Sequence, residues 1–109
     1  FLPGGSLGES HLPFNALNIP AEGGVIELET KPDDPYSVKI GAVVVDGELY
    51  IDPAPERRWY QHMVDNPDIR FRFDGQSSIY TARVYAVEEA DIVSQFESGR
   101  VVLRLGPRL

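Results

Sequence analysis

Two tight-turn signals on either side of a short helical segment constrain the fold of this chain more than any other feature. Asp46-Gly47 lies between two segments rich in β-branched and aromatic residues, 36–45 and 48–51. An Asp-Gly pair supplies the positive φ angles that a two-residue hairpin turn requires. A second pair of alternating segments flanks Gly75. The order hairpin, helix, hairpin predicts antiparallel strand pairing.

A helical pattern lies between the two hairpins and runs from about Glu56 to Asn66, where Pro67 ends it. Spacings of i, i+3 and i+4 define one face that we expect to be buried, formed by Trp59, Tyr60, Met63 and Val64. Outside this region the sequence predicts a strand over 25–30, a strand over 69–74, a strand over 78–87, a short helix over 89–96 and a last strand over 100–105.

These elements predict the fold class. Short antiparallel strands with two short helices and no βαβ repeat indicate a mainly β protein, a six-stranded antiparallel split β-barrel, with a two-sheet sandwich as the alternative. The 109 residues suffice for one domain with a modest core, and the large surface of so small a domain leads us to expect a homodimer. We divide the chain into a flexible tether and irregular lead-in, 1–24, and a split-barrel domain, 25–109. Within the lead-in, apolar side chains should lie against the domain: Leu12, Phe14, Leu17 and Ile19.

The charge balance and the residue types exclude several functions. A net charge of −7 disfavours nucleic acid and anionic membrane surfaces as partners, and the absence of cysteine excludes disulfides and thiol chemistry. No apolar run approaches the roughly 20 residues of a membrane-spanning helix. The two histidines, His11 and His62, are distant in sequence, so we predict no metal site. Ser77-Ser78 lacks a strand-turn-helix elbow, and we predict no catalytic residue.

The N-terminal segment bears on location. Residues 1–10 are rich in Gly and Ser, a composition typical of the tether that follows the lipid-bearing cysteine of an exported lipoprotein. Because the chain begins at Phe1, we expect that a signal peptide, a tag or another segment has been removed. One interpretation is a cell-envelope or periplasmic protein that reaches the membrane only through a lipid anchor. The other is a cytoplasmic protein with an ordinary disordered N-terminus.

Several short segments together resemble a known superfamily. They are YSVKI at 36–40, DGELYI at 46–51, RRWYQHM at 57–63, NPDIRF at 66–71 and VVLRLGPR at 101–108. In this order they resemble the FMN-binding split-barrel superfamily, which includes pyridoxamine-phosphate-oxidase-like proteins and deazaflavin-dependent nitroreductases. Together with the tether, the segment 30–38 also resembles small exported, lipid-anchored bacterial members of that superfamily.

The resemblance implies a cofactor and a site. Members that bind flavin nucleotides hold the phosphate with basic side chains on the second strand and at the start of the following helix. The matching residues here are Lys39, Arg57 and Arg58. FMN or a deazaflavin would then lie in a groove at the interface of a homodimer. Trp59 and Tyr60 are candidates for stacking on such a planar ligand.

Each of these residues also has an interpretation without a ligand. The three basic side chains can be solvated charges, with the arginines paired to Glu56 or Asp65, and the aromatic pair fits core packing on a helix face. The sequence also departs from the family pattern before the second strand. Where deazaflavin-binding relatives carry a glycine-rich basic loop, this chain has Pro32-Asp33-Asp34-Pro35, whose carboxylates would repel a phosphate.

Two hypotheses about function follow. The first is a small cell-envelope split-barrel protein that serves as a non-enzymatic ligand-binding or interaction module. The alternative is an FMN- or deazaflavin-dependent oxidoreductase with the cofactor in a homodimer groove. The acidic loop and the acidic net charge favour the first, and the basic residues of the strand and helix favour the second.

Overall fold

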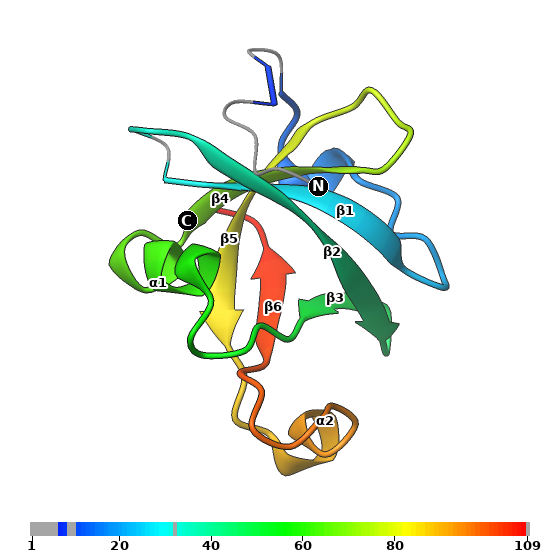
Figure 1. The fold of residues 1–109 in the computed structure, drawn as a ribbon. Helices are drawn as coiled ribbons and strands as arrows, with labels where there is room; N and C mark the ends of the chain where they lie inside the picture. The colour runs from blue at the N-terminus through cyan, green and yellow to red at the C-terminus, as the bar shows by residue number, and fades with distance from the viewer. Residues whose placement is uncertain (1–6, 9–10, 32, 109) are drawn as a thin grey trace.

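Six strands form one closed antiparallel barrel, in the order β1-β2-β3-β6-β5-β4 (Figure 1). The computed structural model describes residues 7–8, 11–31 and 33–108. The prediction of a mainly β barrel is confirmed, and the sandwich alternative is wrong because β1 pairs with β4 and closes the sheet on itself. The elements are η1 Phe14–Ala16, β1 Gly24–Thr30, β2 Tyr36–Val45, β3 Glu48–Ile51, α1 Arg58–Asp65, β4 Asp68–Phe73, β5 Tyr80–Ala86, α2 Ala90–Val93 and β6 Leu103–Gly106.

The β2–β3 hairpin turns where the sequence predicts it. Asp46 has φ 51° and Gly47 has φ 78°, the left-handed conformation that an Asp-Gly turn supplies. The turn sets the register of the hairpin, in which Val45 pairs with Glu48. Gly75 also has a positive φ, 83°, but the β4–β5 connection is longer than a two-residue turn because β5 begins only at Tyr80.

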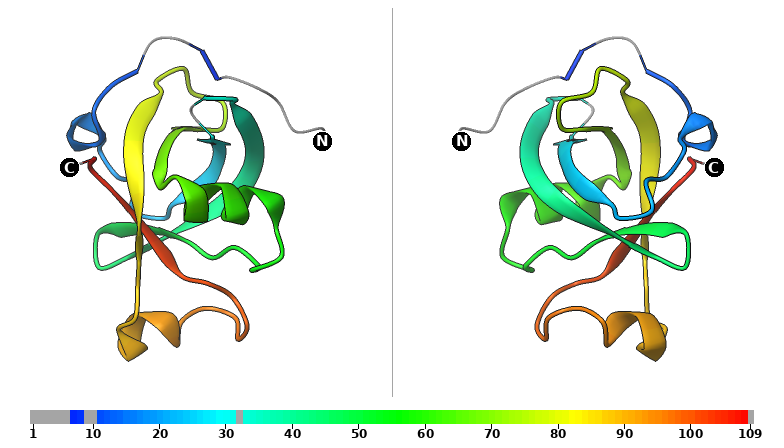
Figure 2. Two further views of the ribbon diagram at one scale, coloured as in Figure 1. Left: turned by 90° about the vertical axis from the view of Figure 1, so that its left-hand side faces the viewer. Right: turned by 90° about the vertical axis from the view of Figure 1, so that its right-hand side faces the viewer.

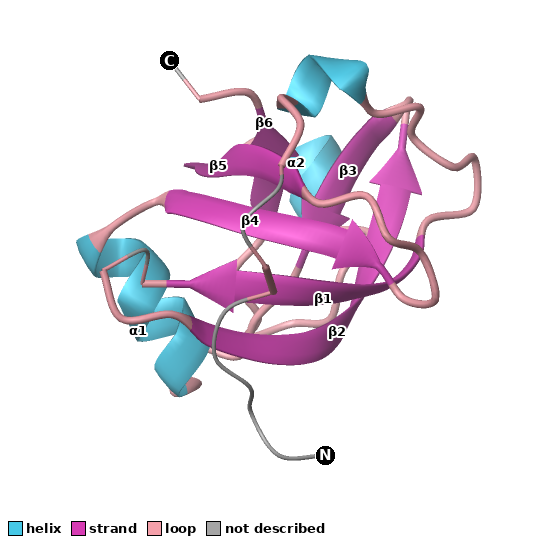
Figure 3. Cartoon of the chain, turned by 90° about the horizontal axis from the view of Figure 1, so that it is seen from above, coloured by secondary structure: helices cyan, strands magenta, loops and turns pink. Residues whose placement is uncertain are grey.

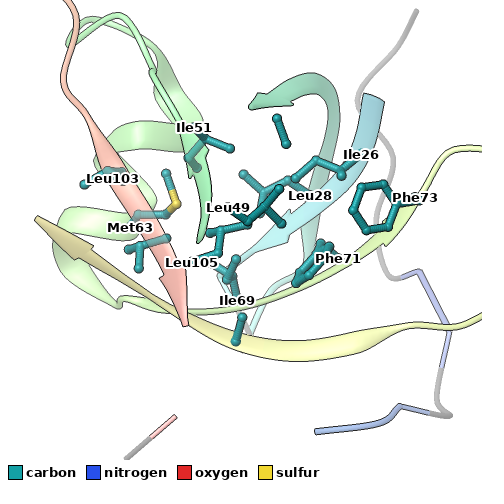
Figure 4. Packing of buried hydrophobic residues seen from close by; sticks show 13 residues of the cluster. Ile26, Leu28, Leu49, Ile51, Met63, Ile69, Phe71, Phe73, Leu103 and Leu105 are labelled. Carbon is teal, nitrogen blue, oxygen red and sulfur yellow. The ribbon is translucent and has the colours of Figure 1, made fainter. Parts of the chain in front are cut away.

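Alternating side chains of the strands fill the barrel interior (Figure 4). Phe71 is fully buried, and its ring lies 6.0 Å from that of Phe73, 5.9 Å from Tyr80 and 6.2 Å from Phe14, measured between ring centroids. The predicted alternation of β4 is confirmed, since its aromatic and aliphatic residues point inward and its arginines outward. The buried cluster comprises Ile26, Leu28, Ala42, Leu49, Ile51, Met63, Ile69, Phe71, Phe73, Ala82, Val84, Leu103 and Leu105.

The lead-in packs against the barrel. Phe14, Leu17 and Ile19 contact the core, as the sequence predicts, and Phe14 opens the single turn of η1. Leu12 adds a parallel bridge to Tyr80: its N–H donates to the Ile79 carbonyl at 2.7 Å. The predicted tether lies outside the described residues except for 7–8, and the division at residue 24 stays a prediction.

Helix α1 is shorter and less buried than the sequence predicts. It begins at Arg58 rather than Glu56, because the Arg57 N–H donates to the Ala54 carbonyl in a preceding turn, and it ends before Pro67 as predicted. Figure 3 shows α1 alongside the end of β1 and the start of β2. Only Met63 is buried, and the expectation that Val64 is buried is wrong: 59% of it is exposed, because the helix contacts the barrel along a narrow stripe.

The β5–β6 connection projects from the barrel and carries α2 (Figure 2). The helix spans only Ala90–Val93, shorter than the predicted 89–96. Phe96, just beyond it, packs against Tyr50 with ring centroids 6.1 Å apart and covers the outer side of β3. Burial, followed by the nearby charge of Glu48, raises the pKa of Tyr50. No helix among the described residues is long and apolar enough to cross a bilayer.

The outer face of β1 and β4 carries ion pairs across their shared seam. Glu29 accepts two hydrogen bonds from Arg70, from Nε to Oε1 and from Nη2 to Oε2, each at 2.8 Å. The side chains are only 4% and 14% exposed, respectively. One step along the same strands, Arg72 donates to Glu27 at 2.8 Å. The seam that closes the barrel is therefore held by charge pairs as well as by the backbone ladder.

Candidate functional site

An open groove of about 770 Å³ lies between β2 and the segment that enters α1. A volume of this size falls within the range of about 300–1,000 Å³ that is usual for small-molecule sites. Its walls combine aromatic, aliphatic and charged side chains. The lining residues are Tyr36, Val38, Lys39, Glu56, Arg57, Arg58 and Trp59.

The segment between β3 and α1 is anchored at two points, and this anchoring holds one wall of the groove in place. Pro53 is fully buried, and its carbonyl accepts a hydrogen bond from the Val101 N–H at 3.0 Å. The Pro55 carbonyl accepts from Gln61 Nε2 at 2.9 Å, which ties the segment to the helix that follows it. Arg57 and Arg58 therefore extend from a fixed backbone.

The basic side chains of the groove differ in whether they form ion pairs. Lys39 lies on the outer face of β2 and forms an ion pair with Asp74 at 3.2 Å. Arg57 and Arg58 are exposed, and neither forms an ion pair within the part of the chain that the structure describes. The expectation that the arginines pair with Glu56 or Asp65 is therefore wrong. They remain exposed guanidinium groups on a chain of net charge −7.

Four of the five residues predicted for a cofactor site line this groove, and Tyr60 does not. Tyr60 borders a separate, mainly apolar pocket of about 210 Å³ with Met63, Val64, Pro67, Val84, Ala86 and Leu103. Trp59 and Tyr60 are both half-buried and packed against the core, so core packing accounts for part of each ring. Trp59 alone of the pair also faces the groove.

The acidic loop before β2 borders a different depression. Asp33 lines a pocket of about 420 Å³ together with Lys31, His62, Asp65 and Asn66. Asp34 forms an exposed ion pair with Lys31 at 3.3 Å, and Pro32 lies outside the described residues. Asp33 and Asp34 are thus not part of the groove lining, and the expectation that they repel a phosphate stays a prediction.

His62, on α1, contacts the end of β1 and the start of β2. Its Nδ1 lies 2.9 Å from the hydroxyl of Thr30, and its ring lies 5.0 Å from the ring of Tyr36, nearly perpendicular at 84°. Burial lowers the pKa of His62, and the positive charges of Lys31 and Arg58 lower it further. The residue is half-buried and hydrogen-bonded. Among the described residues, no group of three His, Asp or Glu side chains is placed to hold a metal ion.

Sequence reasoning did not single out Tyr36 or Thr30 as parts of this site. Tyr36 begins β2 and lines the groove, and it pairs with Thr30 across the β1–β2 ladder. That pairing depends on the register of the two strands around a turn that carries no Asn-Gly or Asp-Gly signal. The predicted strands 25–30 and 36–45 end and begin at these two residues, but the sequence does not define their register.

Comparison with known proteins supports the fold and no more. No protein-family model matches the chain, and no curated protein matches it. Among solved structures, it is similar to the crystal structure of a NimC/NimA family protein from Clostridium acetobutylicum. The TM-score is 0.63 at 19% sequence identity, and the match covers 77% of this chain and 74% of that one. A similarity at this identity shows the barrel architecture, which agrees loosely with the split-barrel resemblance of the sequence.

Proposed function

We propose that the protein is a ligand-binding module whose groove takes a planar, anionic small molecule of the flavin-nucleotide type. One observation carries the proposal. Arg57 and Arg58, which have no ion-pair partner among the described residues, border the same groove as the rings of Trp59 and Tyr36. Guanidinium groups left exposed on an otherwise acidic protein are suited to bind a phosphate or carboxylate by paired, charge-assisted hydrogen bonds.

The start of α1 adds to this attraction. Arg57 is the N-cap residue of the helix, and its side chain makes no capping hydrogen bond to the first turn. The first amide groups of a helix carry partial positive charge and are oriented toward an approaching anion. An anion bound by Arg57 and Arg58 would therefore lie near that helix terminus, while a planar group attached to it reaches the aromatic rings of the groove.

A second candidate function is a flavin-dependent oxidoreductase. It is favoured by the position of Lys39, Arg57 and Arg58 in one groove, as the split-barrel resemblance implies for a flavin phosphate. Among the described residues that line the groove there is no histidine, cysteine or serine. Redox chemistry at this site would come from the bound flavin, and the protein would supply position and charge. A second copy of the chain, which we also propose, would close the open side of the groove.

The location in the cell envelope remains a proposal supported by the Gly/Ser-rich N-terminal segment. The upstream coding sequence tests it directly. A hydrophobic signal that ends in a cysteine just before Phe1 is the expected result. A soluble N-terminal extension there would contradict the envelope location without affecting the groove.

Binding is tested by the absorbance spectrum of the purified protein and by titration with FMN, riboflavin and a deazaflavin, followed by fluorescence. We expect FMN to bind more tightly than riboflavin, which lacks the phosphate. Arg57→Ala together with Arg58→Ala should weaken FMN binding roughly tenfold or more, because each charge-assisted hydrogen bond contributes about 1.5–3 kcal/mol. Equal affinities for FMN and riboflavin would contradict the phosphate site.

The matched control is Arg83→Ala. It removes one positive charge, as each single groove substitution does, from β5, where Arg83 pairs with Asp68 at 2.9 Å outside the groove, and it should leave FMN affinity unchanged. A protein that binds none of the three probes contradicts the proposed function. The oxidoreductase candidate requires more: bound FMN must be reduced by a nicotinamide cofactor faster than free FMN. Binding without that acceleration favours the non-enzymatic module.

A further inference from the structure

Thr30, Tyr36 and His62 meet where β1, β2 and α1 converge. Thr30 is the last residue of β1, is completely buried, and pairs with Tyr36, the first residue of β2. Its hydroxyl donates to the Tyr36 carbonyl at 3.3 Å and lies 2.9 Å from His62 Nδ1. Residues from β1, β2 and α1 thus form one hydrogen-bonded junction beside the groove.

The hydrogen bonds of this junction fix the orientation of the His62 ring. A hydroxyl group has one proton, so when the Thr30 hydroxyl donates it to the Tyr36 carbonyl, it accepts a hydrogen bond from His62 Nδ1–H. With Nδ1 held in this way, the imidazole meets the Tyr36 ring in an edge-to-face arrangement, with centroids 5.0 Å apart. The His62 ring therefore supports the Tyr36 side chain where Tyr36 lines the groove.

The junction also lies next to the charged part of the groove. Arg58 precedes His62 by one helical turn on α1, and it is among the charges that His62 senses. The other charged groups that face His62 are Lys31 and Asp34 from the β1–β2 turn and Asp65 from α1, with Asp33 in the adjoining pocket. His62 itself is not among the residues that line the groove.

We propose that His62 is a positioning residue for the groove: it holds the Tyr36 ring against the planar part of a bound ligand, without contacting the anion. This inference rests on the proposed function for its ligand. It assigns recognition to two separate parts, with Arg57 and Arg58 binding the anionic group and Tyr36, supported by His62, packing on the ring system. Loss of His62 should therefore change the selectivity of the groove and not only its overall affinity.

Two variants and two probes separate these parts. His62→Asn retains a group able to hydrogen-bond Thr30 and removes the ring, whereas His62→Phe retains the ring. We expect His62→Asn to weaken FMN binding by about tenfold and to leave the affinity for inorganic pyrophosphate within about twofold. His62→Phe should retain most of the FMN affinity of the wild type. Equal losses for both probes in His62→Asn, or no loss for either, would overturn the inference.

A ligand-free measurement keeps the two proposals distinguishable. In the free protein, we expect the NMR signals of the Tyr36 ring protons to shift with pH in step with the titration of the His62 imidazole, and to lose that shift in His62→Asn. Tyr36 signals that ignore pH would show that His62 does not hold the ring. A wild-type protein that binds neither FMN nor pyrophosphate overturns the proposed function, and the NMR titration then decides the role of His62 by itself.

Discussion

The arginines on the outer face of the β1–β4 seam, called the wall below, and the arginines that line the groove have opposite roles. On the wall, Arg70 forms two hydrogen bonds with Glu29, and both side chains are largely buried. At the groove, Arg57 and Arg58 are exposed and have no ion-pair partner among the described residues. Arginine thus stabilises the fold at the wall and remains open to solvent or a ligand at the groove.

The difference shows how to separate structural charges from candidate binding charges. The Glu29–Arg70 pair joins residues 41 apart in sequence across the β1–β4 seam, and the Leu7 N–H donates to the same carboxylate at 2.8 Å. The hydrogen bonds that Arg70 donates to Glu29 raise the pKa of Arg70, which keeps it charged. A charge satisfied in this way has little left to offer a ligand, whereas no described residue forms an ion pair with the groove arginines.

The largest effect should come from breaking the wall pair. Arg70→Ala leaves the Glu29 carboxylate buried without its bidentate partner, and we expect it to lower the free energy of unfolding by about 3–5 kcal/mol. Urea denaturation followed by circular dichroism measures this change. The control, Arg70→Met with Glu29→Gln, removes both charges and should cost much less. A loss below about 1 kcal/mol for Arg70→Ala would remove the contrast between wall and groove.

A smaller effect is expected one step along the same seam. Arg72 is 30% exposed and Glu27 is 18% exposed, so solvent compensates for part of a broken pair. Arg72→Ala should therefore lower the free energy of unfolding by about 1 kcal/mol in the same urea experiment. A loss of unfolding free energy as large as that of Arg70→Ala would mean that the solvent exposure of a wall ion pair does not predict its contribution to stability.

The wall could be predicted from the sequence only in part. Alternation over 69–74 correctly placed Arg70 and Arg72 on the outer face of β4. The partners could not be predicted, because they lie on β1 and reach the arginines only through the pairing of Ile26 with Phe73 and Leu28 with Phe71 that closes the barrel. Local periodicity carries no information about which distant strand will form that seam.

The groove, too, could be predicted from the sequence only in part. The resemblance and the strand and helix pattern named Lys39, Arg57 and Arg58, and the fold brings these residues to one groove. The engagement of Lys39 with Asp74 and the support of Tyr36 by His62 depend on strand register and on how α1 docks against the barrel. Neither can be inferred from spacing in the sequence. The exposure of Val64 was mispredicted for the same reason, since helical spacing defines a face but not how much of it is covered.

Acidification should weaken the fold slightly through His62, which lies between the wall and the groove. Its pKa is lowered from the ordinary value of 6.5, mainly by burial. The unfolded chain therefore binds a proton at a higher pH than the folded protein does, so this contribution is fully present above pH 6.5 and is lost as the pH falls through the lowered pKa. Between about pH 7 and about pH 5, the wild type should lose more stability than His62→Asn in urea denaturation. Equal losses of stability in the wild type and in His62→Asn would contradict this role of His62.

The smallest effect on stability should come from the groove arginines. Arg57→Ala and Arg58→Ala, singly or together, should leave the free energy of unfolding within about 0.5 kcal/mol of wild type, because both side chains are exposed and neither is paired among the described residues. Urea denaturation in parallel with Arg70→Ala makes the comparison direct. A loss above about 1 kcal/mol would mean that these arginines hold the β3–α1 segment in place and are structural like those of the wall. No loss of stability combined with a loss of FMN affinity would show that their charges act on the ligand alone.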